Sequence, residues 1–261
     1  PSLTRHINQL ETELNTILFE RNNRSMKLTI EGEKLVKFSK KYRHEWDKLK
    51  DDLSNHQHIL SGDILISCSV TASYAILPKI LKSFRAKHPQ IKISIRTVEA
   101  EDVLNIVNQN NADIGITAQP LSPAHHLSFK EILSTPLILI QSPTHSFDKA
   151  HGNNYIFPEG GPTEHLIKKW FNKEKINTKP YTLTKGFEEN ISLSASGYGI
   201  GIIPKIVLEN SPLQKSVKII TTKNPLPNLS ICICTTKTKL KLKRISAFWE
   251  NTKSTKKGAP L

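Results

Sequence analysis

Ser69 and Thr71 are the side chains whose types and placement first indicate a binding site. Both follow residues 63–68, a continuous apolar run of strand length, and both precede an amphipathic helix expected over residues 74–87. Short hydroxyls beside free backbone N–H groups at the positive end of a helix can hold a carboxylate. Thr71 could equally act only as the N-cap of its helix, and the two roles are compatible.

Other pairs of reactive side chains do not indicate a metal site. His125 and His126 lack the spacing of metal ligands and have no Cys partner nearby in the sequence. Cys232 and Cys234 place both sulfurs on one face of a strand, but a lone C-x-C pair without further Cys or His is not a zinc site. We therefore expect loop histidines, buried thiols and no metal.

The glycine string at Gly197, Gly199 and Gly201 does not predict dinucleotide binding. It follows a helix and runs into a strand, which is the reverse of the strand-to-helix order that the motif needs. No Ser-His-Asp order, phosphate-binding loop or paired-carboxylate motif stands out. We expect neither an enzyme nor a cofactor.

Strands and helices alternate from residue 61 onward, which predicts an α/β fold with a parallel sheet. Expected strands lie at residues 63–68, 91–95, 112–117, 127–133, 137–141, 155–157, 181–184, 197–204 and 229–234. Expected helices lie at residues 74–87, 101–109, 162–175, 188–196 and 239–251. Two Rossmann-like lobes with a hinged pocket between them, as in periplasmic binding proteins, fit this order. Ligands in such sheets bind at the carboxyl ends of strands.

Residues 1–60 differ from the rest, because they are charged and mainly helical in pattern. The spacing of Leu3, Ile7, Leu10 and Leu14 predicts an amphipathic helix, and these side chains together with Phe19 are expected in the core.

A second helix is expected from residue 33 to about residue 58, with Thr29 as its N-cap. Leu35, Tyr42 and Leu49 recur every seven residues and form a narrow apolar seam. Such a seam favours pairing with a second helix, as in a coiled coil.

Composition favours an anionic partner. The 261 residues hold 37 Lys and Arg against 23 Asp and Glu, a net charge of +14, and nucleic acid is the first candidate. Residues 237–261 hold eight Lys and Arg against one Glu, so half of the excess lies in the last helix and a tail expected to be disordered. Three Cys and the lack of a leader or membrane-spanning run fit a cytoplasmic protein. The first residue is Pro1, so we expect a fragment or a processed chain.

The order and spacing of several N-terminal motifs resemble the DNA-binding domain of LysR-type transcriptional regulators. The motifs are residues 3–11 (LTRHINQLE), 18–21 (LFER) and 28–32 (LTIEG), and residues 196–204 (SGYGIGIIP) resemble a segment of the family's second lobe. Asn15 stands where the family usually has Gly, at an expected left-handed position. Because complete members begin with two further helices, residues 1–32 are expected to form only a partial winged helix-turn-helix.

The resemblance implies a domain plan. It comprises the partial winged helix-turn-helix (residues 1–32), a linker and dimerisation helix (33–60), lobe I (about 61–141 and 236–252), lobe II (about 142–235) and a tail (253–261).

A narrower resemblance is to the members that activate isoleucine and valine biosynthesis. Residues 60–63, 68–74, 161–162, 170–171, 204, 207–212 and 247–249 carry it. It implies acetolactate or acetohydroxybutyrate as inducer, double-stranded operator DNA, a homodimer or homotetramer, and RNA polymerase as a partner. A LysR-type regulator of another pathway, or a two-lobe solute-binding protein without DNA-binding activity, remains the alternative.

Three groups of residues follow as candidates. The expected DNA contacts are Ser2, Thr4, Arg5, Gln9, Arg21, Arg24 and Lys27. The expected effector contacts are Ser69, Val70, Thr71, Thr97, Glu99, Gly160, Gly161, Pro162, Phe187, Glu188 and Ile203, with plain core as the alternative for Phe187 and Ile203. The expected dimer seam is Leu35, Tyr42 and Leu49.

Overall fold

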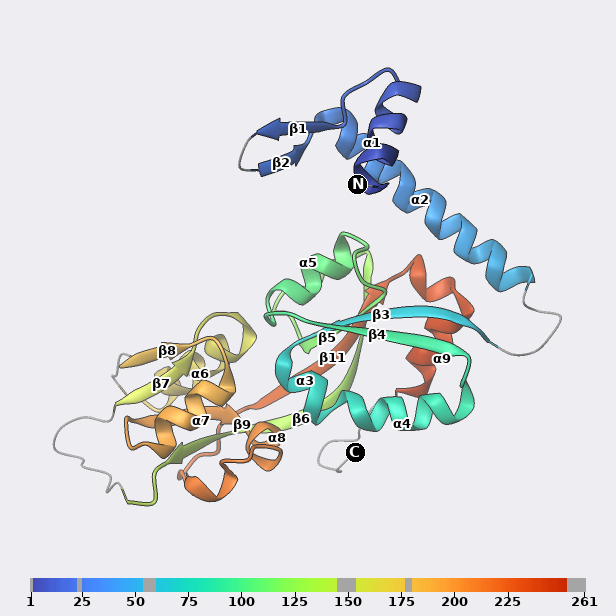
Figure 1. The fold of residues 1–261 in the computed structure, drawn as a ribbon. Coiled ribbons are helices and arrows are strands. Elements are labelled where there is room, and N and C mark those ends of the chain that lie inside the picture. The colour runs from blue at the N-terminus through green and yellow to red at the C-terminus, as the bar shows by residue number, and fades with distance from the viewer. Residues whose placement is uncertain (1, 23–24, 54–59, 145–153, 177–179, 253–261) are drawn as a thin grey trace. The chain divides into compact units, whose positions relative to one another are not determined.

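The computed structural model describes residues 2–22, 25–53, 60–144, 154–176 and 180–252 (Figure 1). Two compact units make up the chain, Pro1–Gln57 and His58–Leu261. Arg24, the end of the expected linker and the expected tail at residues 253–261 lie outside the described residues. None of the helices in the described part is long and apolar enough to cross a bilayer.

The N-terminal unit contains two helices and a hairpin. They are α1 (Ser2–Glu13), β1 (Phe19–Asn22), β2 (Ser25–Leu28) and α2 (Ile30–Leu53). The strands pair antiparallel, with Phe19 opposite Leu28. Asn15 has φ of 46°, so the left-handed turn predicted after α1 is confirmed.

Helix α2 begins with the cap that the sequence predicts, three residues earlier than expected. The Gly32 N–H donates to Thr29 Oγ1 at 3.0 Å, and that hydroxyl donates to the Ile17 carbonyl at 2.7 Å. Glu31 and Glu33 lie in the first turn, where the helix dipole favours acidic side chains. Thr29 therefore ties the start of α2 to the chain that leaves α1.

The larger unit contains two lobes that share one mixed sheet. The strands run in the order β4-β3-β5-β11-β6-β9-β7-β8, and β10 pairs with β6. Lobe I contains β3 (Gly62–Cys68), α3 (Val70–Ala75), α4 (Leu77–Lys87), β4 (Ile91–Thr97), α5 (Asp102–Asn108), β5 (Ile114–Ala118), η3 (Lys239–Lys241) and α9 (Lys243–Asn251).

Lobe II contains the shorter strands and the second set of helices. They are β7 (Tyr155–Pro158), α6 (Gly161–Lys173), β8 (Thr182–Thr184), α7 (Phe187–Ala195), β9 (Ile200–Pro204), α8 (Lys205–Glu209), η2 (Gln214–Ser216) and β10 (Lys218–Ile220). Two long strands, β6 (Leu127–Gln141) and β11 (Asn228–Thr236), run between the lobes (Figure 1).

The expectation of two separate strands at residues 127–133 and 137–141 is wrong. They form the single strand β6, which pairs antiparallel with β11 up to Pro136 and with β9 from Leu137 onward. Pro136 interrupts the apolar pattern but lies where the strand changes partners. The sheet is therefore mixed rather than parallel, because β11 is antiparallel to both β5 and β6.

The expected helix at residues 74–87 begins earlier and is broken. Helix α3 starts at Val70, the backbone breaks at Ile76 with φ of −116°, and α4 continues with Pro78 in its first turn. Proline is favoured there because the first N–H groups of a helix have no partner within the helix.

Each lobe has its own apolar core. In lobe I, α4 packs on α9 through an edge-to-face contact of Phe84 and Phe248, whose centroids are 4.9 Å apart. In lobe II, Trp170 and Phe171 of α6 pack with Tyr155 and Phe157 of β7. These contacts hold α4 and α9 in lobe I and α6 in lobe II.

The glycine string joins helix α7 to strand β9, as predicted. Gly197 has φ of 81°, and the Tyr198 N–H donates to the Leu193 carbonyl at 3.0 Å, which closes the end of the helix. A side chain at Gly201 would collide with the Asn190 and Ser194 side chains. Gly201 therefore allows α7 to pack closely on β9.

Candidate functional site

The first corner of lobe I places Ser69, Val70 and Thr71 together at the start of α3. Ser69 is the N-cap, and its Oγ accepts from the Ala72 N–H at 3.3 Å. The suggestion that Thr71 caps the helix is therefore wrong. Thr71 is only 7% exposed, and its hydroxyl makes no hydrogen bond to any residue that the structure describes, whereas Val70 is 53% exposed. Because the Thr71 hydroxyl is not among the fully buried side-chain atoms without a partner in the described residues, it is open to solvent and available to a ligand.

Thr97 and Glu99 lie beside this corner. The Val98 N–H donates to the Cys68 carbonyl at 3.0 Å, which holds the end of β4 against the end of β3. Both Thr97 and Glu99 are exposed. The carboxyl ends of two adjacent parallel strands therefore present hydroxyl and carboxylate groups at one edge of the sheet.

On lobe II, Gly160, Gly161 and Pro162 form the start of α6. The two glycines have φ of 75° and 66°, a region that side-chain-bearing residues rarely adopt. The Gly160 N–H donates to Glu164 Oε2 at 2.9 Å, and Lys168 Nζ lies 2.6 Å from Glu164 Oε1. The hydrogen bond from Lys168 lowers the pKa of the Glu164 carboxyl.

Phe187 and Glu188 begin α7, and Glu188 reaches lobe I. The Tyr74 hydroxyl of α3 donates to Glu188 Oε1, which joins the two lobes. Phe187 is half-buried against an apolar cluster that also contains Ile203, and Ile203 is fully buried. The structure therefore favours plain core for Ile203.

A second contact between the lobes involves Glu101, at the N-terminus of α5. A methyl group built on Gly160 would collide with Glu101 Oε1, so the carboxylate lies directly against the start of α6. The sequence predicts neither Tyr74 nor Glu101 as a functional residue. Tyr74 follows the helical pattern and Glu101 adjoins an expected helix start, so nothing local marks either as a contact between lobes.

The expected DNA contacts of the N-terminal unit begin at α1. Thr4, Arg5 and Gln9 are exposed, and Gln9 donates to Glu13 at 3.0 Å. Lys27 is exposed on β2, opposite Glu20. Ser2 and Arg21 lie in α1 and β1, but their side chains, like all of Arg24, lie outside the described part.

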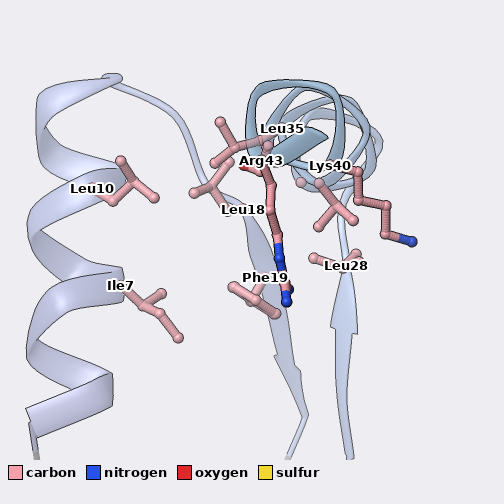
Figure 2. A pocket seen from close by; sticks show the side chains of 11 residues that line it. Ile7, Leu10, Leu18, Phe19, Leu28, Leu35, Lys40 and Arg43 are labelled. Carbon is pink, nitrogen blue, oxygen red and sulfur yellow. The ribbon is translucent and has the colours of Figure 1, made fainter. Parts of the chain in front are cut away.

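A pocket of about 340 Å³ separates α1 from α2. Figure 2 shows Ile7 and Leu10 of α1 facing Leu18 and Phe19, with α2 seen nearly end-on at the upper right. The prediction of a buried position is wrong for Leu3, Leu10 and Leu14, which are 70%, 37% and 47% exposed. The described residues of this unit form too few helices and strands to bury every apolar side chain of α1.

Helix α2 exposes an apolar stripe away from that pocket. Phe38, Tyr42, Trp46 and Leu49 are 58%, 68%, 58% and 46% exposed, and the Phe38 and Tyr42 rings are 5.4 Å apart. Leu35 instead lines the pocket. The stripe therefore includes two of the three expected dimer residues and not the third.

The thiols of the three cysteines are buried. Cys68, Cys232 and Cys234 are buried and free, and burial raises the pKa of Cys68 to about 11 and of Cys232 to about 12. In the part of the chain that the structure describes, no cluster of three or more His, Cys, Asp or Glu could hold a metal ion.

Family models match nearly the whole chain. Residues 1–33 match the bacterial regulatory helix-turn-helix of the lysR family, and residues 57–256 match the LysR substrate binding domain. The transcriptional activator IlvY of Salmonella typhimurium is 35% identical over 264 residues, covering 95% of this chain and 88% of that protein. IlvY of Escherichia coli K12 is 34% identical with the same coverage.

Solved structures have the same fold. A full-length OxyR variant of Pseudomonas aeruginosa gives a TM-score of 0.68 at 16% identity, over 97% of this chain and 87% of that chain. CbnR, a LysR family transcriptional regulator, gives 0.59 at 17% identity, over 97% and 90%. With the match at residues 1–33, these comparisons disfavour a solute-binding protein. The chain belongs to the LysR family of bacterial transcriptional regulators.

Proposed function

We propose that this protein is an activator of isoleucine and valine biosynthesis genes that responds to acetolactate or acetohydroxybutyrate. The observation that carries the proposal is its 34–35% identity to IlvY proteins over 95% of the chain. The corner at α3 supports a small hydroxy-keto acid, because it offers the Thr71 hydroxyl, which has no partner among the described residues, beside Ser69. We propose that the protein acts in the cytoplasm, where operator DNA is present.

The effector would lie between the corner at Ser69, Val70 and Thr71 and the first turns of α6 and α7. Thr97 and Glu99 border the same corner, and the proposed contacts from lobe II are Gly160, Gly161, Pro162, Phe187 and Glu188. Ile203 is not part of the proposed contact set, because it is fully buried in the core of lobe II.

For DNA, α1 would enter the major groove with Ser2, Thr4, Arg5 and Gln9, and Arg5 is the proposed guanine or phosphate contact. Arg21, Arg24 and Lys27 on the hairpin would bind phosphates. A homodimer or homotetramer formed through the stripe on α2 would place two copies of α1 on one palindromic site. RNA polymerase is the proposed further partner in activation.

Calorimetric titration with a panel of small acids tests the proposed effector. Acetolactate and acetohydroxybutyrate are expected to bind saturably, while pyruvate, shikimate and benzoate are expected to give no saturable heat. A preference for another acid would favour the alternative, a LysR-type regulator of another pathway, and would overturn the proposed effector.

A further inference from the structure

A run of lysines at one end of lobe I is not used by the proposed function. Lys237, Lys239, Lys241 and Lys243 follow β11 and extend through η3 into the start of α9, and no acidic residue lies between them. Lys237, Lys241 and Lys243 are exposed. We call residues 237–243 the basic segment. Closely spaced charges of one sign create a local field that attracts an anionic partner.

The basic segment is fixed to lobe I by its other contacts. Leu242 is buried in the core of the lobe, and the Lys239 N–H donates to Thr236 Oγ1 at 3.2 Å at the start of η3. Lys239 Nζ donates to the Ala112 carbonyl and to Asp113 Oδ1, both at 2.8 Å. Lys239 is therefore an anchor, and the exposed lysines project from a backbone that a partner does not have to order.

The charges of Lys237 and Lys241 are not compensated by the described part of the chain. Neither side chain makes a hydrogen bond or an ion pair with any residue that the structure describes. Two neighbouring stretches, residues 104–112 and 119–130, contain no Asp or Glu. The first supplies the carbonyl that Lys239 binds, and the second contains His126, whose carbonyl accepts from the Lys237 N–H at 3.0 Å.

Asp113 and Asp63 also lie at this end of lobe I, and both have basic neighbours. Asp113 binds Lys239 Nζ through Oδ1, and its Oδ2 accepts from the Leu65 N–H at 2.8 Å. Asp63 is exposed near the start of β3, where it lies opposite Lys92 of β4. Each carboxylate therefore has a cation beside it, and the exposed lysines of the basic segment keep their positive charge.

The charge of the whole chain indicates the kind of partner. A second copy carries the same net charge of +14, so two copies repel each other electrostatically. A polyanion is complementary to the basic segment. Because residues 1–33 match a bacterial regulatory helix-turn-helix, duplex DNA is the polyanion that this chain meets.

The chain also enters lobe I at the end where the basic segment lies. Arg244, the residue after the segment, donates from Nε to the Asp63 carbonyl at 3.0 Å, just after the start of β3. Only residues 54–61 separate the end of α2 from the start of β3 in the sequence. A short connection of this kind raises the effective concentration of bound DNA at lobe I.

We propose that the basic segment binds the phosphate backbone of duplex DNA, as a second DNA contact besides the N-terminal unit. Lys237 and Lys241 pair with phosphates and read no base, so they add affinity without sequence specificity. Counterions released from the phosphates make this contact strongly dependent on salt. The inference goes beyond the proposed activator function and does not depend on the effector.

Binding of a duplex without an operator tests the basic segment on the full chain. Fluorescence anisotropy with a labelled duplex of arbitrary sequence gives the association constant at salt concentrations from about 50 to 200 mM. Lys237→Gln together with Lys241→Gln is expected to weaken binding about eightfold to sixtyfold at about 0.1 M salt, because each lost phosphate contact removes about 0.9 from the slope of log K against log salt.

Lys215→Gln together with Lys223→Gln is the matched control. Both side chains are exposed on lobe II and make no hydrogen bond or ion pair with a described residue, so this variant loses the same charge elsewhere. It is expected to keep the slope of the parent chain. An equal loss in the control, or no binding of the duplex by the parent chain, would overturn the proposal.

A charge-preserving variant separates the charge from the fold. Lys237→Arg together with Lys241→Arg is expected to bind the duplex with the slope of the parent chain, because both positive charges remain. A loss as large as that of the glutamine variant would overturn the proposal. An unchanged slope in the glutamine variant would overturn it too, and would leave an acidic protein surface as the partner of the basic segment.

Discussion

The Tyr74 hydroxyl donates a hydrogen bond to the Glu188 carboxylate, and this bond joins the first helix of lobe I to the first turn of α7 in lobe II. Tyr74 follows the hydroxyl corner at Ser69 and Thr71 by one turn of α3. The bond therefore joins the lobes beside the groups that we propose for effector binding.

Removing this bond should lower the stability of the larger unit. Tyr74→Phe is expected to lower the free energy of unfolding by about 1 kcal/mol, because it deletes one hydrogen bond and keeps the ring. Urea unfolding measures the change. Tyr181→Phe is the control, since the Tyr181 side chain is exposed, its ring centroid lies 5.3 Å from that of Tyr198, and its hydroxyl donates no hydrogen bond to a described residue. Equal losses in the two variants would contradict the role of the bond.

Much of the local structure is predictable from the sequence, because local chemistry determines it. Asn15 takes the left-handed turn and Thr29 caps α2 as their residue types predict. The sequence suggests Thr71 as the N-cap of α3, whereas Ser69 has that position in the structure. Either hydroxyl could cap a helix, and the backbone conformation decides which one does.

The contacts between lobes are not predictable in this way. Glu101 and Gly160, like Tyr74 and Glu188, are far apart in sequence, and their meeting depends on how β6 and β11 bring the lobes together. Neither helical nor strand periodicity in the sequence predicts such a contact. Ile203 is buried because α7 and α8 pack on β9, and the apolar pattern of the sequence does not predict that packing.

The buried thiols predict a loss of stability at alkaline pH. The pKa of Cys68 is raised from 9.0 to about 11, so an unfolded thiol loses its proton above pH 9 while the folded one keeps it. Stability is therefore expected to fall as pH rises from 9 to 11. In urea unfolding at about pH 8 and about pH 10, on either side of the unfolded pKa, Cys68→Ala should show a smaller fall than the parent chain. An identical fall in both would contradict the assignment.

The apolar stripe on α2 predicts self-association. Tyr42→Lys together with Trp46→Lys is expected to shift the protein to monomer, because charge replaces two exposed rings of the proposed seam. Sedimentation equilibrium measures the mass. Leu35 is a poor target, since it lines the pocket between α1 and α2. Lys37→Glu, which changes charge off the stripe, should leave the mass unchanged, and an unaltered mass in the double variant would remove the stripe from the interface.

Arg5 is the side chain of α1 expected to matter most for DNA. Arg5→Gln should weaken operator binding by about 1–3 kcal/mol, the range for one bidentate base contact. Fluorescence anisotropy at fixed salt measures the affinity. Lys87→Gln removes the same charge in the larger unit, at the end of α4, and should have little effect. Comparable weakening in both variants would indicate only general electrostatic attraction.

The effector site is tested most directly by calorimetric titration of acetolactate into the parent chain and into Thr71→Val. The parent chain is expected to bind saturably. The variant should bind about threefold to tenfold more weakly, because it lacks the hydroxyl and keeps the shape. Thr182→Val, on the edge strand β8, should bind as the parent does. Undiminished affinity in Thr71→Val, or no binding to the parent, would contradict an acid effector held at the corner of α3.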